Sequence, residues 1–370
     1  MNAKTIIFPF YAKVFIFIIG LLAFFAILYI AQSIIIPLVF ALIISILLHP
    51  VVNFFVRYRI NRIIAILITL LLTFIILAGI STLVISQAVR LADSWPILVE
   101  KMTGLLDNLA QWASEYFDID PQKIDAWIFK TKGEFLNTSS AAIGQTLLSL
   151  GGGLIVLFLI PVYIFLILFY ERLLLDFIRK LFGISSQSQV NEVIIQTKVV
   201  IQHYLTGLLI EALMVATLYI TTLFILGIDY AILLGIIGAF LNMIPYVGGL
   251  VGVGLPMIVA LATKSSAWYA VYVLAIFYFI QLIDNNIIVP KIVASKVKIN
   301  ALFAILAVLA GNALWGIPGM FLSLPLLAII KLIFDHIEPL KPWGFLLGDT
   351  MPAMIALKLN LKIDKEKSDE

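Results

Sequence analysis

The sequence contains no cysteine, three histidines and few charged residues. Without cysteine the chain can form no disulfide and has neither a thiol nucleophile nor a thiolate metal ligand. Charged residues make up 12% of the chain and apolar residues 63%, whereas soluble domains average roughly 25% charged and 45–50% apolar. This composition excludes a soluble globular protein and indicates a polytopic membrane protein.

Sequence signatures of catalysis are also missing. There is no Gly-x4-Gly-Lys-Ser/Thr loop for ATP, no His-Glu-x-x-His zinc motif and no Ser-His-Asp candidate. The three histidines are scattered, at positions 49, 203 and 336. The sequence therefore predicts a protein that is not an enzyme, holds no metal or other cofactor and has no nucleic-acid partner.

Long apolar runs predict an all-α, polytopic integral membrane protein. A helix needs about 20 residues to cross a hydrocarbon core of ~30 Å, and the chain offers about six such spans. There is no series of alternating ten-residue strands, which argues against a membrane barrel. The predicted spans are 14–32, 34–55, 63–85, 151–170, 205–227 and 267–289.

Lysine and arginine clusters in short loops set the orientation of the spans. Counting spans places the N-terminus, the C-terminus and all three clusters on one side, which the positive-inside rule makes cytoplasmic. The clusters are Arg57, Arg59 and Arg62; Arg172, Arg179 and Lys180; and Lys291, Lys296 and Lys298. Residues 86–148 then lie outside, where helical spacing of their apolar residues predicts two to four amphipathic helices.

Two similar breaks interrupt the C-terminal half, at 242–249 and 311–319. Their apolar arms of about 10 to 14 residues are too short to cross a bilayer, so both predict re-entrant helical hairpins. The expected tip residues are glycines for positive φ or close backbone approach, prolines that end an arm and asparagines that offer amides. They are Gly248, Gly249, Gly316 and Gly319; Pro245 and Pro318; and Asn242 and Asn312.

The order of spans and hairpins predicts an inverted repeat. A span running outward, 205–227, precedes a hairpin near 230–262, and a span running inward, 267–289, precedes a hairpin near 301–333. Such repeats supply the two states of alternating access. The predicted domains are a transmembrane scaffold (1–85), an extracytoplasmic segment (86–148), a helix with a cytoplasmic connector (149–203), a transport domain (204–335) and a cytoplasmic tail (336–370).

Two polar groups within predicted spans are candidates for a binding site, because ionisable residues at membrane depth are costly. Gln281, Asp284 and Asn285 share a helix face and, with Asn286 and the following Pro290, suit a small polyol or a cation; the alternative is a helix-ending cap. Glu211 could bind a cation or carry a proton. Its alternative is a hydrogen bond between helices made by a protonated Glu.

The runs 244–249, 281–292 and 311–325 resemble, in order and spacing, the autoinducer-2 exporter family of bacterial membrane proteins, and the similarity extends over nearly the whole chain. The resemblance carries Asp284, Asn285 and Pro290 over as family positions. It implies a location in the bacterial inner membrane and a homo-oligomer such as a pentamer. Members of the family are credited with export of the quorum-sensing furanone or with sodium or lithium/proton antiport.

The sequence thus predicts a secondary active transporter that exports a small polar solute, such as autoinducer-2, by alternating access coupled to a proton or cation gradient. One alternative is a Na⁺(Li⁺)/H⁺ antiporter. Another is a membrane scaffold or assembly factor that uses residues 86–148 as a docking surface.

Overall fold

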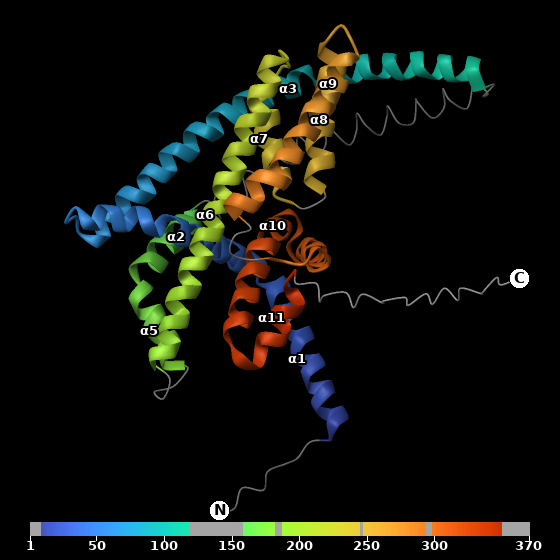
Figure 1. The fold of residues 1–370 in the computed structure, drawn as a ribbon. Helices are drawn as coiled ribbons and strands as arrows, with labels where there is room; N and C mark the ends of the chain where they lie inside the picture. The colour runs from blue at the N-terminus through green and yellow to red at the C-terminus, as the bar shows by residue number, and fades with distance from the viewer. Residues whose placement is uncertain (1–8, 118–157, 182–186, 245–246, 294–297, 350–370) are drawn as a thin grey trace, which may run out of the picture.

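The computed structural model describes residues 9–117, 158–181, 187–244, 247–293 and 298–349, and the regular structure within these ranges is helical (Figure 1). The first half comprises α1 (Phe10–Ile30), α2 (Gln32–Arg57), α3 (Arg62–Phe117), a helix at Phe158–Phe169 and α5 (Glu171–Leu181). The second half comprises α6 (Gln187–Ile225), α7 (Ala231–Asn242), α8 (Val247–Thr263), α9 (Trp268–Ile283), the π-helical η2 (Asp284–Val293), α10 (Ala301–His336), the short 3-10 helix η3 (Glu338–Leu340) and α11 (Lys341–Leu347).

Six of the described helices are long and apolar enough to cross a membrane, which confirms the prediction of an all-α polytopic membrane protein. Many of their large apolar side chains are exposed on the outside of the protein, which would be unfavourable in water. Helix α1, for example, has no buried residue. Exposed apolar surface of this extent marks contact with lipid. A helix suits that surrounding because its backbone groups are satisfied within the segment.

Helix α3 differs from the prediction. It was expected to end near residue 85, but it continues as one helix of 56 residues to Phe117, about 84 Å at the usual rise and far more than a bilayer core. No glycine or proline occurs from residue 80 to Pro96, so nothing ends the helix there. In Figure 1, α3 passes behind α6 and α7 and then turns. The rest of the predicted outer segment, 118–148, lies outside the described residues.

Both predicted helical hairpins are present. In the first, Gly248 at the start of α8 lies directly against the backbone of Leu241 in α7. In the second, α10 is broken at Gly316, which has φ 61° and ψ −141°, and the backbones of Gly311 and Gly319 touch. The chain therefore reverses at Gly316.

The tip glycines play different parts from one another. Gly316 is the only predicted tip glycine with a positive φ, whereas Gly248 and Gly319 are needed for close backbone approach, because a Cβ would overlap a neighbouring carbonyl. Pro318 falls in the first turn after the break, where proline is tolerated. Pro245 lies outside the described residues. Helix α8, with 17 residues, is longer than the predicted arm, whereas α7, with 12 residues, has the predicted length.

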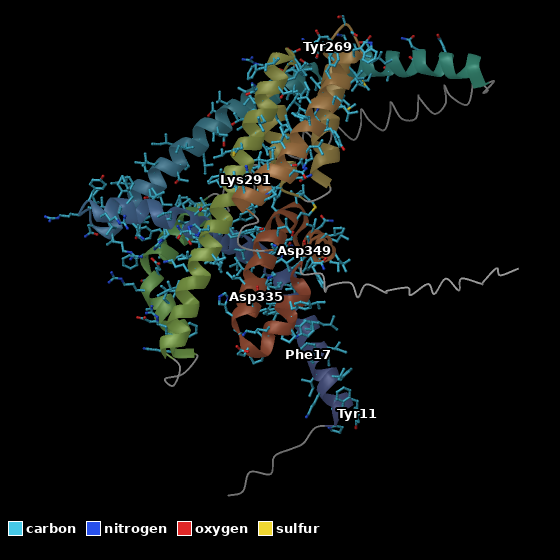
Figure 2. The ribbon with its side chains drawn as sticks, viewed as in Figure 1. Tyr11, Phe17, Tyr269, Lys291, Asp335 and Asp349 are labelled. Atoms are coloured by element: carbon cyan, nitrogen blue, oxygen red, sulfur yellow. The ribbon has the colours of Figure 1, made fainter. Side chains whose placement is uncertain are left out.

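The two repeat units run in opposite directions. In Figure 1, α6 rises from beside α5, while α9 begins at the top and the α10 hairpin lies below α7 and α8. Figure 2 shows the same course for the second unit, from Tyr269 at the top to Lys291 and then down to Asp335. This arrangement agrees with the predicted inversion.

Small residues let the helices of the first unit pack closely. A Cβ on Gly235 would overlap Ile220 of α6, and Gly238 faces Gly252 across the α7–α8 hairpin. Gly254 differs from these glycines, because a Cβ at this position would have no neighbour within 4 Å.

The C-terminal segment is packed where it was expected to be a tail. Gly344 of α11 lies against Asp335 of α10, and Lys331 donates a hydrogen bond of 2.6 Å to that carboxylate. The backbone N–H of Asn300 also donates to the carbonyl of Leu347 at 2.9 Å. Residues up to 349 therefore belong to the folded unit.

Candidate functional site

A cavity of about 870 Å³ lies between α6, the first hairpin, α9 with η2, and the arms of the second hairpin. Aliphatic and aromatic side chains form much of its wall. The polar and charged residues that line it are Tyr204, Glu211, Tyr219, Asn242, Tyr278, Gln281, Asp284, Asn285, Lys298 and Asp349. A largely apolar cavity with a few convergent polar groups is typical of small-ligand sites.

Asp284 is the most deeply buried of the polar and charged residues that line the cavity. Its side chain is 2% exposed, and its Oδ2 accepts a hydrogen bond of 2.8 Å from Nδ2 of Asn242 at the end of α7. Its Oδ1 is buried and has no hydrogen-bond partner among the described residues. A buried carboxylate oxygen without a partner is costly, so this oxygen is available for a further hydrogen bond or for a cation.

The backbone at Asp284 is unusual as well. The α9 helix gives way there to η2, a π-helical segment that contains Pro290. Wider turns of this kind are rare and often mark functional sites. Gly207 of α6 permits the close approach of η2, because a Cβ at this position would lie 2.7 Å from the carbonyl oxygen of Ile292.

Gln281 brings a second unsatisfied oxygen to the same cavity. Its Oε1 is buried without a hydrogen-bond partner in the described structure, while its Nε2 is 3.4 Å from Oδ1 of Asn285. Gly249 leaves room beside it, since an added Cβ would lie 3.5 Å from that Oε1. Carboxylate and amide oxygens are suitable acceptors for solute hydroxyl groups and suitable ligands for hard cations.

Glu211 lines the cavity from α6 and is 9% exposed. The fold therefore brings the two candidate carboxylates of the sequence, Glu211 and Asp284, to one cavity, although they lie on different helices. His203 is exposed and does not line the cavity.

Other predicted site residues lie elsewhere. Asn312 is exposed near the tip of the second hairpin and does not line the cavity, nor do Gly316, Pro318 and Gly319. That tip meets the N-terminal helices instead, because Nε1 of Trp315 donates to the carbonyl of Leu28 at 3.0 Å.

Two members of the 281–290 motif also stay outside the cavity. Asn286 is exposed and donates to the carbonyl of Leu282 at 2.8 Å, which is a local cap. Pro290 is exposed within η2.

Sequence reasoning missed several lining residues. Tyr204 shares the face of Glu211 through the spacing 204, 208 and 211, a signal that was available in the sequence. Tyr219 stacks on Phe277 of α9, with ring centroids 4.1 Å apart and planes at 3°, a contact that no local pattern predicts.

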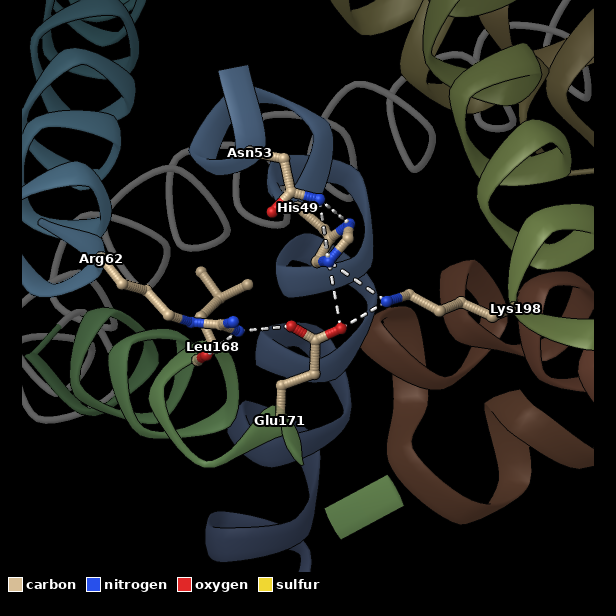
Figure 3. A network of polar contacts seen from close by, with 6 residues as sticks. All are labelled: His49, Asn53, Arg62, Leu168, Glu171 and Lys198. Carbon is tan, nitrogen blue, oxygen red and sulfur yellow. Dashed lines mark hydrogen bonds and ion pairs between the residues drawn. The ribbon is translucent and has the colours of Figure 1, made fainter. Parts of the chain in front are cut away.

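A second polar cluster joins the N-terminal helices to α6 around Glu171 (Figure 3). Glu171 begins α5, just past the Phe158–Phe169 helix, and its carboxylate is 2.5 Å from Nη2 of Arg62 and 3.0 Å from Nε2 of His49. It also pairs with Lys198 of α6. Burial opposes the charged form, but the hydrogen bonds and positive charges of His49 and Lys198 prevail and hold the pKa of this carboxyl well below its usual range.

The helical spans, the paired hairpins and the polar cavity together define a multi-pass membrane transport protein. The sequence pattern of the AI-2E family transporters matches residues 17–338, and the chain belongs to this family. It is 27% identical over 314 residues to YrrI of Bacillus subtilis (strain 168), covering 82% of this chain and 87% of that relative. It is 23% identical over 334 residues to the AI-2 transport protein TqsA of Escherichia coli (strain K12), covering 86% of this chain and 90% of TqsA.

Proposed function

We propose that the protein is a secondary active transporter of the bacterial inner membrane that exports a small polar solute of the autoinducer-2 type. The observation that carries this proposal is Asp284, a buried carboxylate that lines the cavity, accepts a hydrogen bond from the hairpin residue Asn242 and has one oxygen without a partner among the described residues. Binding of a solute hydroxyl or of a coupling ion would satisfy that oxygen. Because Asn242 lies in the first hairpin, binding at Asp284 would alter a hydrogen bond of that hairpin.

The arrangement of the two units supports a mechanism of alternating access. The cavity walls come from both, with α6, α7 and α8 from one and α9, η2 and α10 from the other. A shift of one unit against the other would change which side of the cavity is open. Helix α1, which contacts the tip of the second hairpin through Trp315, would serve together with α2 as the fixed partner.

Cation/proton antiport is a second candidate that one observation favours. Glu211 and Asp284 line the same cavity, and two carboxylates with amide oxygens can hold a monovalent cation or exchange protons. An exporter coupled to such an ion would use the same residues. The two functions therefore differ in whether an organic solute moves with the ion.

Reconstituted proteoliposomes separate these functions. Protein with an imposed sodium or proton gradient would be assayed for autoinducer-2 flux and, with an internal pH dye, for sodium-driven proton movement. Solute flux that depends on the gradient supports the exporter, and sodium-driven proton movement without solute flux supports the antiporter. If neither flux exceeds that of protein-free liposomes, the transport proposal is wrong and the scaffold alternative stands.

Asp284→Asn is the decisive variant. It keeps the size of the side chain but removes the charge, and hydrogen bonds to charged groups contribute about 1.5–3 kcal/mol, so apparent affinity should fall roughly 10- to 150-fold. Asp229→Asn is the matched control, because Asp229 is an exposed residue of the α6–α7 loop outside the cavity. Equal transport by both variants would remove Asp284 from the mechanism.

A further inference from the structure

Two charged residues that the site description has not used, Lys298 and Asp349, also line the cavity. Both are exposed, whereas Asp284 and Glu211 are buried. Of the charged residues that line the cavity, Lys298 and Asp349 are therefore the accessible ones, and the two carboxylates are enclosed.

A backbone hydrogen bond joins the two segments that carry these residues. The backbone N–H of Asn300 donates to the carbonyl of Leu347 at 2.9 Å, and Lys298 and Asp349 each lie two residues from that bond along the chain. Asn300 is fixed in turn, because its side-chain Oδ1 accepts from the N–H of Leu302 at 2.9 Å and so caps α10.

On the other side, α11 is anchored to α10. Gly344 lies against Asp335, and Lys331 pairs with the same carboxylate at 2.6 Å. Figure 2 shows Asp349 at the upper end of the α10–α11 unit, with Asp335 below it. The C-terminal segment is therefore positioned to contribute a side chain to the cavity, although Asp349 lies beyond the part of the chain, 17–338, that the family pattern matches.

We propose that Lys298 and Asp349 form a charged mouth of the cavity and that Asp349 draws cations toward Asp284 and Glu211 while Lys298 opposes them. The inference rests on the proposed function in treating this cavity as the transport path. Behind the mouth, Glu211, Asp284 and Gln281 offer oxygen atoms of the kind that hard cations bind, which makes a monovalent cation the ligand class that the mouth admits.

The absence of cysteine in the natural chain allows a direct test that does not depend on transport. A single cysteine at Leu208, which lines the cavity, would be labelled in purified, detergent-solubilised protein with a cationic trimethylammonium-ethyl and an anionic sulfonatoethyl methanethiosulfonate. Adding Asp349→Asn should slow the cationic reagent and speed the anionic one by about twofold each, the effect of one unit charge roughly 10 Å away in water. The ratio of the two rates should therefore change about fourfold, and Lys298→Gln should change it in the opposite direction.

Glu338→Gln is the matched control, since it removes an exposed C-terminal carboxylate that does not line the cavity. Val289→Cys gives a second reporter that also lines the cavity. A ratio that Asp349→Asn changes no more than Glu338→Gln does at both reporters would overturn the charged mouth. Failure of both cysteines to react in the folded protein, when they react after unfolding, would overturn it as well.

The outcomes of the two experiments are distinct. If the labelling ratio shifts as expected but neither autoinducer-2 nor sodium flux is found, the charged mouth stands and the proposed function fails. If flux is found but the ratio does not respond to Asp349→Asn, the proposed function stands and the mouth fails.

Discussion

Glu171→Gln should destabilise the protein because it removes the only carboxylate of the Glu171 cluster (Figure 3). The charge of Arg62 and Lys198 would then be uncompensated, and the amide oxygen of glutamine could satisfy only part of the lost hydrogen bonding. The cluster joins α2, α3, α5 and α6, so its loss would loosen the contact between the N-terminal helices and the helix that carries Glu211.

The size of the effect follows from burial. The Glu171 side chain is 17% exposed, and those of Arg62 and Lys198 are each 30% exposed. Breaking a fully buried pair costs roughly 3–5 kcal/mol, whereas an exposed pair contributes about 0.2–1 kcal/mol. We therefore expect a loss of about 2–3 kcal/mol, which would lower the apparent Tm in detergent by roughly 4–12 °C.

The stabilisation by Glu171 should also depend on pH, in a direction that follows from its pKa. The pKa of Glu171 is lowered in the folded protein from a reference value of 4.5. The stabilisation is therefore fully present above about pH 4.5 and is lost progressively as the pH falls below the unfolded-state pKa. The Tm difference between wild type and Glu171→Gln should stay constant from pH 7 to about pH 5 and shrink below that.

Asp176→Asn provides the control on the same helix. Asp176 pairs with Arg179 at 2.7 Å, but the two side chains are 59% and 39% exposed, so the Tm should change by less than about 2 °C. Equal Tm values for Glu171→Gln and Asp176→Asn would refute the reasoning. So would a Tm difference that persists unchanged at pH 3.5, because the carboxylate charge could not then be its source.

Two further predictions concern the hairpins and the topology. Gly248→Ala should lower stability by about 1–3 kcal/mol, because its Cβ would overlap the Leu241 backbone. Gly254→Ala, in open space within α8, should leave stability unchanged or raise it by about 0.5–1 kcal/mol; similar Tm values in detergent would contradict the hairpin geometry. Single cysteines at the exposed positions Ser265 and Glu338 should react with an impermeant maleimide from opposite faces of the membrane. Labelling of both from one face would refute the predicted topology.

Much of the fold could be predicted from the sequence because membrane insertion depends on local properties. The length and apolarity of a segment decide whether it can span the bilayer, and glycine or proline within an apolar run decides where it breaks. The hairpin at Gly316 is the clearest case, since its φ of 61° is costly for any residue other than glycine. The continuation of α3 past residue 85 was missed because polar composition suggested a boundary that no helix-breaking residue supports.

The site was only partly predictable because contacts between distant segments depend on how helices rotate and pack. Gln281, Asp284 and Asn285 could be grouped by helical spacing alone, and all three line the cavity. The hydrogen bond from Asn242 to Asp284 required α7 and η2 to meet. The tip of the second hairpin contacts α1 and does not line the cavity, because the indole N–H of Trp315 donates to the carbonyl of Leu28.

The sequence by itself determined the class of protein, the approximate spans and the location of the breaks, because each follows from hydrophobicity and backbone preference over a few consecutive residues. Only the tertiary structure decided which polar groups share a cavity, since Glu211, Asp284 and Asp349 are far apart along the chain. The contacts that join them are set by close helix packing at small residues such as Gly207 and by the docking of α11 on α10. Packing of this kind is a property of the whole fold, which no local pattern contains.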